Sequence, residues 1–137
     1  MKTVLCGICL LLLLPTCARA RDVDTLKVKA LAKSSYSWDG SPLPKYDTGV
    51  PEITILKIVI PPKTRLPMHR HPVINAGVLL KGKLTVVTKD NKTLHLQPGD
   101  AIVELVDKWH YGKNDGDDPA EIIVFYAGTK GKPITQK

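Results

Sequence analysis

Cysteine is missing from most of this chain. All three cysteines, Cys6, Cys9 and Cys17, lie in an apolar stretch at the start of the 137-residue sequence. The remainder has neither a thiol nor a disulfide, so core packing must stabilise it. The chain also has no sequence that resembles a P-loop, a nucleophile elbow or a dinucleotide fingerprint. These absences argue against kinase, serine-hydrolase and nicotinamide-dependent functions.

The chain has no hydrophobic run long enough to cross a bilayer. Its longest run, over residues 4–14, has 11 residues, whereas a span needs about 20. A basic start, this run and Ala18-Arg19-Ala20 predict a secretory signal peptide over residues 1–20, cleaved after Ala20. An uncleaved anchor and a lipoprotein acylated at Cys17 are less favoured alternatives. We therefore expect an exported protein, periplasmic or secreted, with no stable membrane insertion.

Dense clusters of positive charge are missing as well. The 20 basic residues include Lys2 and Arg19 of the leader. The mature chain therefore has 18 basic and 13 acidic residues, a net charge of +5. The lysines are scattered, and no basic run is interleaved with aromatic residues. This pattern predicts no nucleic-acid partner. The positive charge favours an anionic small molecule.

Long periodic segments that would form crossover helices do not occur. Residues 21–50 are polar and rich in Gly and Pro, which predicts an irregular N-terminal arm in which 26–33 forms a short helix or an edge strand. Beyond the arm, β-branched runs predict short strands at 53–60, 73–80, 83–88, 93–96, 101–106, 108–112 and 121–126. Short strands joined by turns predict an all-β sandwich or barrel over residues 51–130, followed by a C-terminal tail over 131–137.

Histidines in two separate segments carry the functional prediction. In PMHRHPVIN (67–75), strand alternation places His69, His71 and Asn75 on one face. A second segment, 99–114, contains His110 and, at the same parity, Asn114. The remaining histidine, His95, lies between two leucines that should face the core, so we expect it to face solvent.

These two segments resemble the two motifs of the cupin superfamily. H-x-H, three residues, Asn75, six residues and Gly82 fit the spacing of the first motif, and Gly99, His110 and Asn114 fit the second. The resemblance covers roughly residues 50–128, and the chain is similar to small, exported, single-domain bacterial cupins. It implies a cupin double-stranded β-helix, a small jelly-roll-like barrel.

The chain departs from the cupin pattern at four positions. Lys63, Leu105 and Asp107 stand where the pattern has Gly, Pro and Gly, and we expect these changes to alter turns only. Asn75 stands where cupins carry a metal-binding glutamate.

The resemblance implies a divalent transition metal (Fe, Mn, Zn, Ni or Cu) held by His69, His71 and His110. Asn75 would be a weak ligand or would hydrogen-bond to a water bound to the metal. Without a carboxylate the unit keeps a charge of about +2 rather than +1, which should weaken metal binding and favour anionic ligands. Asn75→Glu should then raise metal affinity. A metal-free barrel is the alternative.

Three classes of function stay open at this point. The first is a mononuclear metal-dependent enzyme, of dioxygenase or isomerase/lyase type, that acts on a small anionic molecule. The second is a non-catalytic module of the cell envelope that binds a small molecule, and the third is an interaction domain whose barrel is packed shut. The sequence does not decide whether the protein is an enzyme.

Three further residues are candidates for the site. Tyr126 and Asn114 are candidates for the substrate pocket. Glu104 would be a candidate general base if it faced inward, but a solvated strand face is the preferred prediction. The apolar strand over 53–60 needs protection if it lies at a sheet edge, which favours a homodimer.

Overall fold

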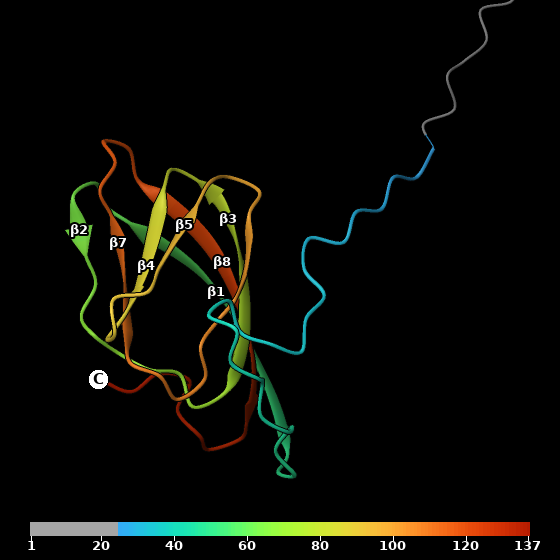
Figure 1. Ribbon diagram of the computed structural model, residues 1–137. Coiled ribbons are helices and arrows are strands. Elements are labelled where there is room, and N and C mark those ends of the chain that lie inside the picture. Colours follow the sequence, from blue (N-terminus) through green and yellow to red (C-terminus); the bar gives the residue numbers. More distant parts are fainter. Residues whose placement is uncertain (1–24) are drawn as a thin grey trace, which may run out of the picture.

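The computed structural model describes residues 25–137 (Figure 1). The predicted signal peptide and the alternative roles of Cys17 therefore fall outside the described residues. Eight strands follow one another in this part of the chain: β1 (Pro51–Ile60), β2 (Thr64–Arg65), β3 (Ile74–Lys81), β4 (Leu84–Thr88), β5 (Thr93–Leu96), β6 (Ala101–Val103), β7 (His110–Asn114) and β8 (Ala120–Thr129). Nowhere in residues 25–137 is there a helix with the length and apolarity of a membrane span.

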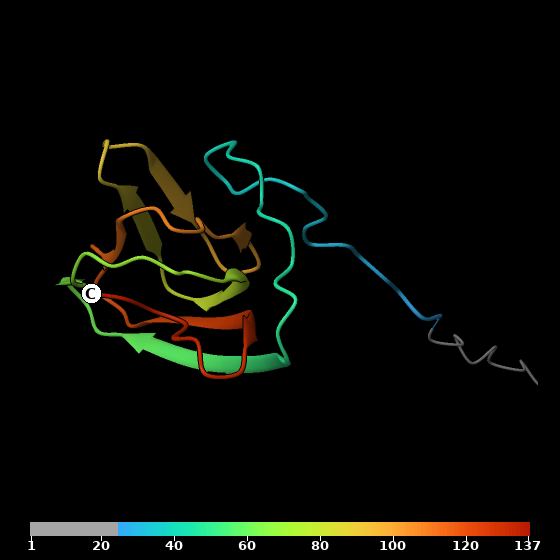
Figure 2. The ribbon, with the colours of Figure 1, turned by 90° about the horizontal axis from the view of Figure 1, so that it is seen from below.

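The strands form two four-stranded antiparallel sheets, ordered β1-β8-β3-β6 and β2-β7-β4-β5. Figures 1 and 2 show the sheets facing each other, with strands that follow one another in sequence often lying in opposite sheets. The all-β prediction is confirmed, and the arrangement agrees with a double-stranded β-helix. Alternation along the strands directs Leu79, Val86, Ile122 and Val124 into one core between the sheets.

The predicted strands match the observed ones closely except around the second histidine segment. The strand predicted over 101–106 ends at Val103, and the next begins at His110 rather than at residue 108. In between, Val106 forms an isolated parallel bridge with His71. Strand β2, only two residues long, was not predicted, because prolines lie on both sides of it and leave no apolar alternation.

The arm forms neither the helix nor the edge strand predicted over residues 26–33. Leu26 and Val28 are 90% and 86% exposed, so no apolar face is buried, and a helix this short is marginal without burial. Further along, the arm packs against the barrel. Trp38 N–H donates to Val103 O (2.9 Å), and Ser37 Oγ–H donates to Glu104 O (2.8 Å).

Two of the departures from the cupin pattern keep a glycine-like backbone. Lys63 and Asp107, which stand where the pattern has Gly, both have φ of 54°. This left-handed conformation costs a residue with a Cβ roughly 1–2 kcal/mol, less for Asp. The turns are therefore retained, and the strain is larger at Lys63.

Substitution of Lys63 tests this strain. Lys63→Gly and Lys63→Ala both remove the exposed ion pair with Asp117, but only glycine relieves the positive φ. We expect Lys63→Gly to be more stable than Lys63→Ala by about 1 kcal/mol in urea unfolding. At an ordinary β position alanine is more stable than glycine. A Lys63→Ala variant more stable than Lys63→Gly would therefore contradict the positive φ at Lys63.

Candidate metal centre and its cavity

A backbone pair joins the two histidine segments. His69 N–H donates to His110 O, and His110 N–H donates to His69 O, each at 2.9 Å. Directly opposed residues in an antiparallel pair project their side chains to the same face. The two imidazoles therefore lie side by side, with ring centroids 4.6 Å apart.

The third imidazole is placed by the chain that follows β6 and by the C-terminal tail. Asp107 N–H donates to His71 O (2.8 Å), which holds this segment beside the first motif. The His71 Nδ1 lies 2.9 Å from Ile134 O and 3.2 Å from Thr135 Oγ1. Residues 131–137, predicted only as a C-terminal tail, contain no motif that indicates contact with the site.

Hydrogen bonds to backbone carbonyls decide which ring nitrogen of each histidine is free. Nδ1 of His69, His71 and His110 faces the carbonyl oxygens of Pro67, Ile134 and Lys108 at 2.8, 2.9 and 2.9 Å, respectively. A carbonyl oxygen only accepts, so each Nδ1 carries the proton and each Nε2 keeps its lone pair. One ligand nitrogen of each ring lies within 4.8 Å of the other two. The free Nε2 lone pairs of the three neutral rings are thus oriented in advance for binding one metal ion.

Burial keeps these imidazoles neutral. It lowers the pKa of His71 to about 4, and it also lowers the pKa of His69 and His110 below the usual value. The carbonyl acceptors oppose this effect only in part. Neutral imidazole is the form that ligates metals, so binding would require no deprotonation of these rings near neutral pH.

Asn75 lies beside the three rings with its amide oxygen unpaired. Its side chain is buried, and Nδ2–H donates to Val73 O at 3.2 Å. Asn75 Oδ1 and His110 Nε2 are both buried without a hydrogen-bond partner among the described residues. Buried acceptors left unpaired are costly, and a cation is one partner that satisfies several at once. The residues present therefore fit a metal ion.

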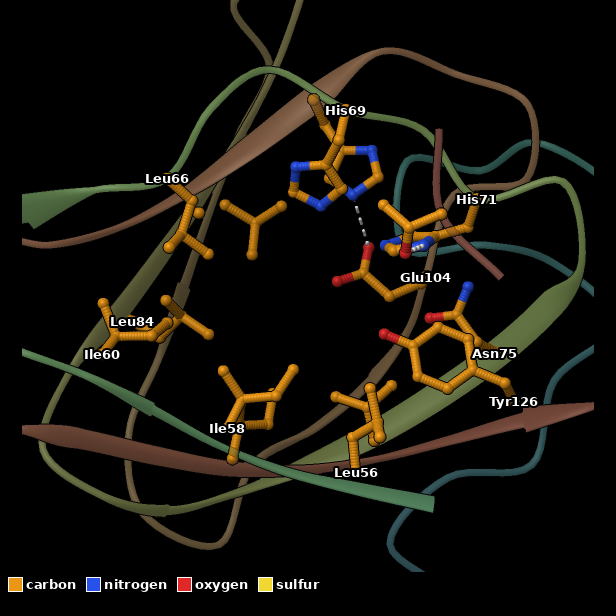
Figure 3. Close-up of a pocket in the computed structure, with 16 residues that line it drawn as sticks. Leu56, Ile58, Ile60, Leu66, His69, His71, Asn75, Leu84, Glu104 and Tyr126 are labelled. Atoms are coloured by element: carbon orange, nitrogen blue, oxygen red, sulfur yellow. Dashed lines mark hydrogen bonds and ion pairs between the residues drawn. The ribbon is translucent and has the colours of Figure 1, made fainter. Parts of the chain in front are cut away.

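A cavity of about 170 Å³ opens below the histidines. Its far wall is apolar, with Leu56, Ile58, Ile60, Leu66 and Leu84 among its lining residues (Figure 3). Tyr126, a candidate for the substrate pocket, lines the same cavity and lies on the side of Asn75. Burial raises the pKa of Tyr126 to about 12, so its hydroxyl remains a hydrogen-bond donor.

Glu104 lies inside the cavity, and the preferred prediction of a solvated face for it is wrong. The residue is 9% exposed, and its Oε2 lies 3.6 Å from His110 Nε2 (Figure 3). Burial raises the pKa of Glu104 to about 7, although the Leu105 N–H lowers it in part. Strand alternation contained the signal for this placement. Ile102 faces the core, and Glu104 shares its parity.

Asn114 lies outside the cavity, contrary to its assignment to the substrate pocket. Its Nδ2 donates to the carbonyl oxygens of Ile60, Pro61 and Asp118, and its Oδ1 accepts from Gly116 N–H. With all these bonds made, its role is to hold the loop after β7 against the end of β1. His95 is exposed, as predicted, and contacts Thr85.

Residues 56–126, more than half of the chain, match the Cupin domain family. The chain is a cupin. A search of curated proteins gives no significant match.

Solved structures of this cupin fold are similar at low sequence identity. The DMSP lyase DddQ from Ruegeria pomeroyi matches with a TM-score of 0.54 and 18% identity over 71% of this chain and 46% of its own. An oxalate oxidase in complex with glycolate matches with a TM-score of 0.53 and 20% identity, over 80% and 59%. An uncharacterised double-stranded β-helix protein from Klebsiella pneumoniae matches with a TM-score of 0.53 and 16% identity, over 68% and 90%.

These matches show the fold alone. The chain spans about half the length of the lyase and the oxidase, 46% and 59% respectively.

The metal-free protein should show the raised pKa of Glu104 in its stability. Between its ordinary pKa of 4.5 and the folded value of about 7, the folded state holds a proton that the unfolded chain releases. The contribution of this proton to the free energy of unfolding is complete below pH 4.5 and is lost as the pH rises through 7. Glu104→Gln should therefore match the wild type at pH 4 and exceed it by up to about 3 kcal/mol above pH 8.

Urea unfolding in the presence of a chelator, over a series of pH values, measures this difference. Glu52→Gln is the matched control because Glu52 is exposed, and its difference from wild type should stay near zero throughout. A Glu104→Gln difference that does not change with pH would contradict the buried carboxyl.

Proposed function

We propose that this cupin is an exported protein that binds a divalent transition metal through His69, His71 and His110 and acts on a small anionic molecule. The observation that carries the proposal is the commitment of all three Nδ1–H groups to backbone carbonyls. Three lone pairs then converge at one end of a cavity. Three imidazoles suit Fe, Mn, Zn, Ni and Cu.

The proposed activity is of dioxygenase or isomerase/lyase type. A divalent ion bound at the histidines would supply Lewis-acid or redox chemistry. Around it, the Tyr126 hydroxyl offers a hydrogen bond to a substrate oxygen, and Glu104 offers a carboxyl group within the same cavity. Proteins of this fold described as a lyase and as an oxidase with glycolate support an enzyme of this general class.

The cavity restricts the substrate to a small molecule. Its volume of about 170 Å³ is below the roughly 300–1,000 Å³ of sites for drug-sized ligands. The histidine end would carry net positive charge with a metal bound, whereas the opposite wall is apolar. A small molecule with one anionic oxygen end and a short apolar remainder fits both ends.

The apolar wall also favours a second candidate function. A non-catalytic module of the cell envelope would hold a small ligand in the same cavity without converting it. Such a module would be stabilised by its ligand but would release it unchanged, which product analysis distinguishes from turnover. The third class, a barrel packed shut, disagrees with the cavity.

The predicted leader over residues 1–20 supports the proposed export, with the mature N-terminus at Arg21. Intact-mass measurement of protein recovered from outside the cytoplasm tests this; a chain that retains residues 1–20 would contradict it. We propose no nucleic-acid partner, because the positive charges are scattered along the sequence.

Metal content is the direct test of the proposed site. Protein purified from its own compartment should contain close to one transition-metal ion per chain by elemental analysis. His71→Ala should lose at least 90% of this metal, a reduction of about 10-fold or more. His95→Ala is the matched control, because His95 is exposed and away from the cavity, and it should keep the wild-type content. A metal-free wild-type protein would contradict the proposal.

We further propose that the protein is a homodimer formed through β1. Within residues 25–137 this strand of ten residues pairs with β8 alone, so the backbone groups of its other edge are open to pairing by a second copy. Its outward side chains Ile53, Ile55 and Val59 are 53%, 64% and 54% exposed, and Phe125 opposite Ile55 is 43% exposed. A long apolar edge of this kind is protected by a second copy in many oligomers.

Light scattering tests the dimer. The wild-type protein should have twice the mass of one chain, and Ile55→Lys should shift it to a single-chain mass by placing a charge in the contact. Thr93→Lys, on an exposed position of the other sheet, should leave the mass unchanged. A single-chain mass for the wild type would contradict the proposal.

A further inference from the structure

Glu104 lies next to the position where the cupin pattern has its glutamate. Its N–H donates to the Asn75 carbonyl oxygen at 3.0 Å, so the two residues are neighbours on adjacent segments. Both side chains line the cavity with the three histidines. Figure 3 shows the Glu104 side chain surrounded by His69, His71, Asn75 and Tyr126.

The contacts of the Glu104 carboxyl group leave it short of donors. Among the described residues its one hydrogen bond is from Leu105 N–H to Oε2, at a long 3.3 Å. The nearest ring nitrogen, His110 Nε2 at 3.6 Å, carries a lone pair because the Nδ1–H of that ring donates to Lys108 O. When Glu104 is ionised, two acceptors therefore face each other in a buried site, and the unpaired Oδ1 of Asn75 is a third. A cation satisfies all of them, whereas a neutral donor satisfies one.

The N-terminal arm bonds to the backbone that carries this carboxyl group. Ser37 Oγ–H donates to Glu104 O at 2.8 Å, and Trp38 N–H donates to Val103 O at 2.9 Å. The next residue, Leu105, is fully buried. The backbone of Glu104 is thus bonded on both sides, which directs its side chain into the cavity rather than towards solvent.

We propose that Glu104 is the anionic ligand of the metal, in the role that the cupin pattern gives to the residue at position 75. This assignment rests on the proposed three-histidine site and extends it. The carboxylate then comes from the second motif segment instead of the first, and the metal with its ligands carries about +1 rather than +2. Asn75 would contribute at most its neutral amide oxygen.

A double-variant cycle tests the assignment without any measurement of activity. Affinities for Co²⁺ are measured by competition with a chromophoric chelator, and the visible absorption of bound Co²⁺ reports its ligands. Glu104→Gln should weaken binding by at least about 10–100-fold, the loss known for removal of a group that merely supports a ligand, and should change the spectrum. Asn75→Glu in the Glu104→Gln background should restore most of the affinity, because position 75 lies beside the lost carboxylate.

Two control variants accompany the cycle. Glu52→Gln removes an exposed carboxylate and should leave the affinity and the spectrum unchanged. Asn75→Glu alone should change the affinity less than it does in the Glu104→Gln background, because one carboxylate already serves the metal. Circular dichroism confirms that each variant is folded.

The outcomes separate this inference from the proposed function. If wild-type protein binds no Co²⁺ at one ion per chain, the three-histidine site fails and this assignment fails with it. If wild type and Glu104→Gln bind with equal affinity and identical spectra, the histidine site stands and Glu104 is not a ligand. An equal gain from Asn75→Glu in both backgrounds would likewise overturn the assignment.

Discussion

The mutual backbone hydrogen bonds between His69 and His110 are the constraint on which the rest of the site depends. Each residue donates its N–H to the carbonyl of the other at 2.9 Å, although the two lie in separate motifs. This pairing brings two imidazoles onto one face, and His71 joins them because its carbonyl holds the segment after β6. Any change that separates these segments would disperse the three imidazoles while leaving both sheets intact.

Buried imidazoles require partners, and three separate segments provide them. The carbonyl groups of Pro67, Lys108 and Ile134 each accept one Nδ1–H. In two cases the acceptor lies two residues before the histidine, so local backbone conformation orients the ring. The third comes from the C-terminal tail, which therefore belongs to the site. This second layer of contacts fixes the free nitrogens of all three rings towards the cavity.

The cavity has a polar end at the histidines and an apolar wall opposite it. Leu56, Ile58 and Ile60 of β1 form part of the wall with their inward side chains, while the outward residues of the same strand remain exposed. One strand thus contributes to the cavity wall and to the proposed dimer contact. At the polar end, a carboxyl group and an amide oxygen share a small buried volume with three lone pairs. The polar end therefore gathers several buried acceptors in one place.

The sequence by itself determined the all-β class, most strand positions and the histidines of the site, because alternation and motif spacing are local properties. The solvent-facing position of His95 followed from the same alternation. Tertiary structure decided what depends on contacts between distant segments. It placed Glu104 in the cavity beside His110, engaged Asn114 in backbone bonds outside the cavity, and brought the tail to His71. Such contacts follow from how two sheets close on each other, and no spacing within one segment encodes that closure.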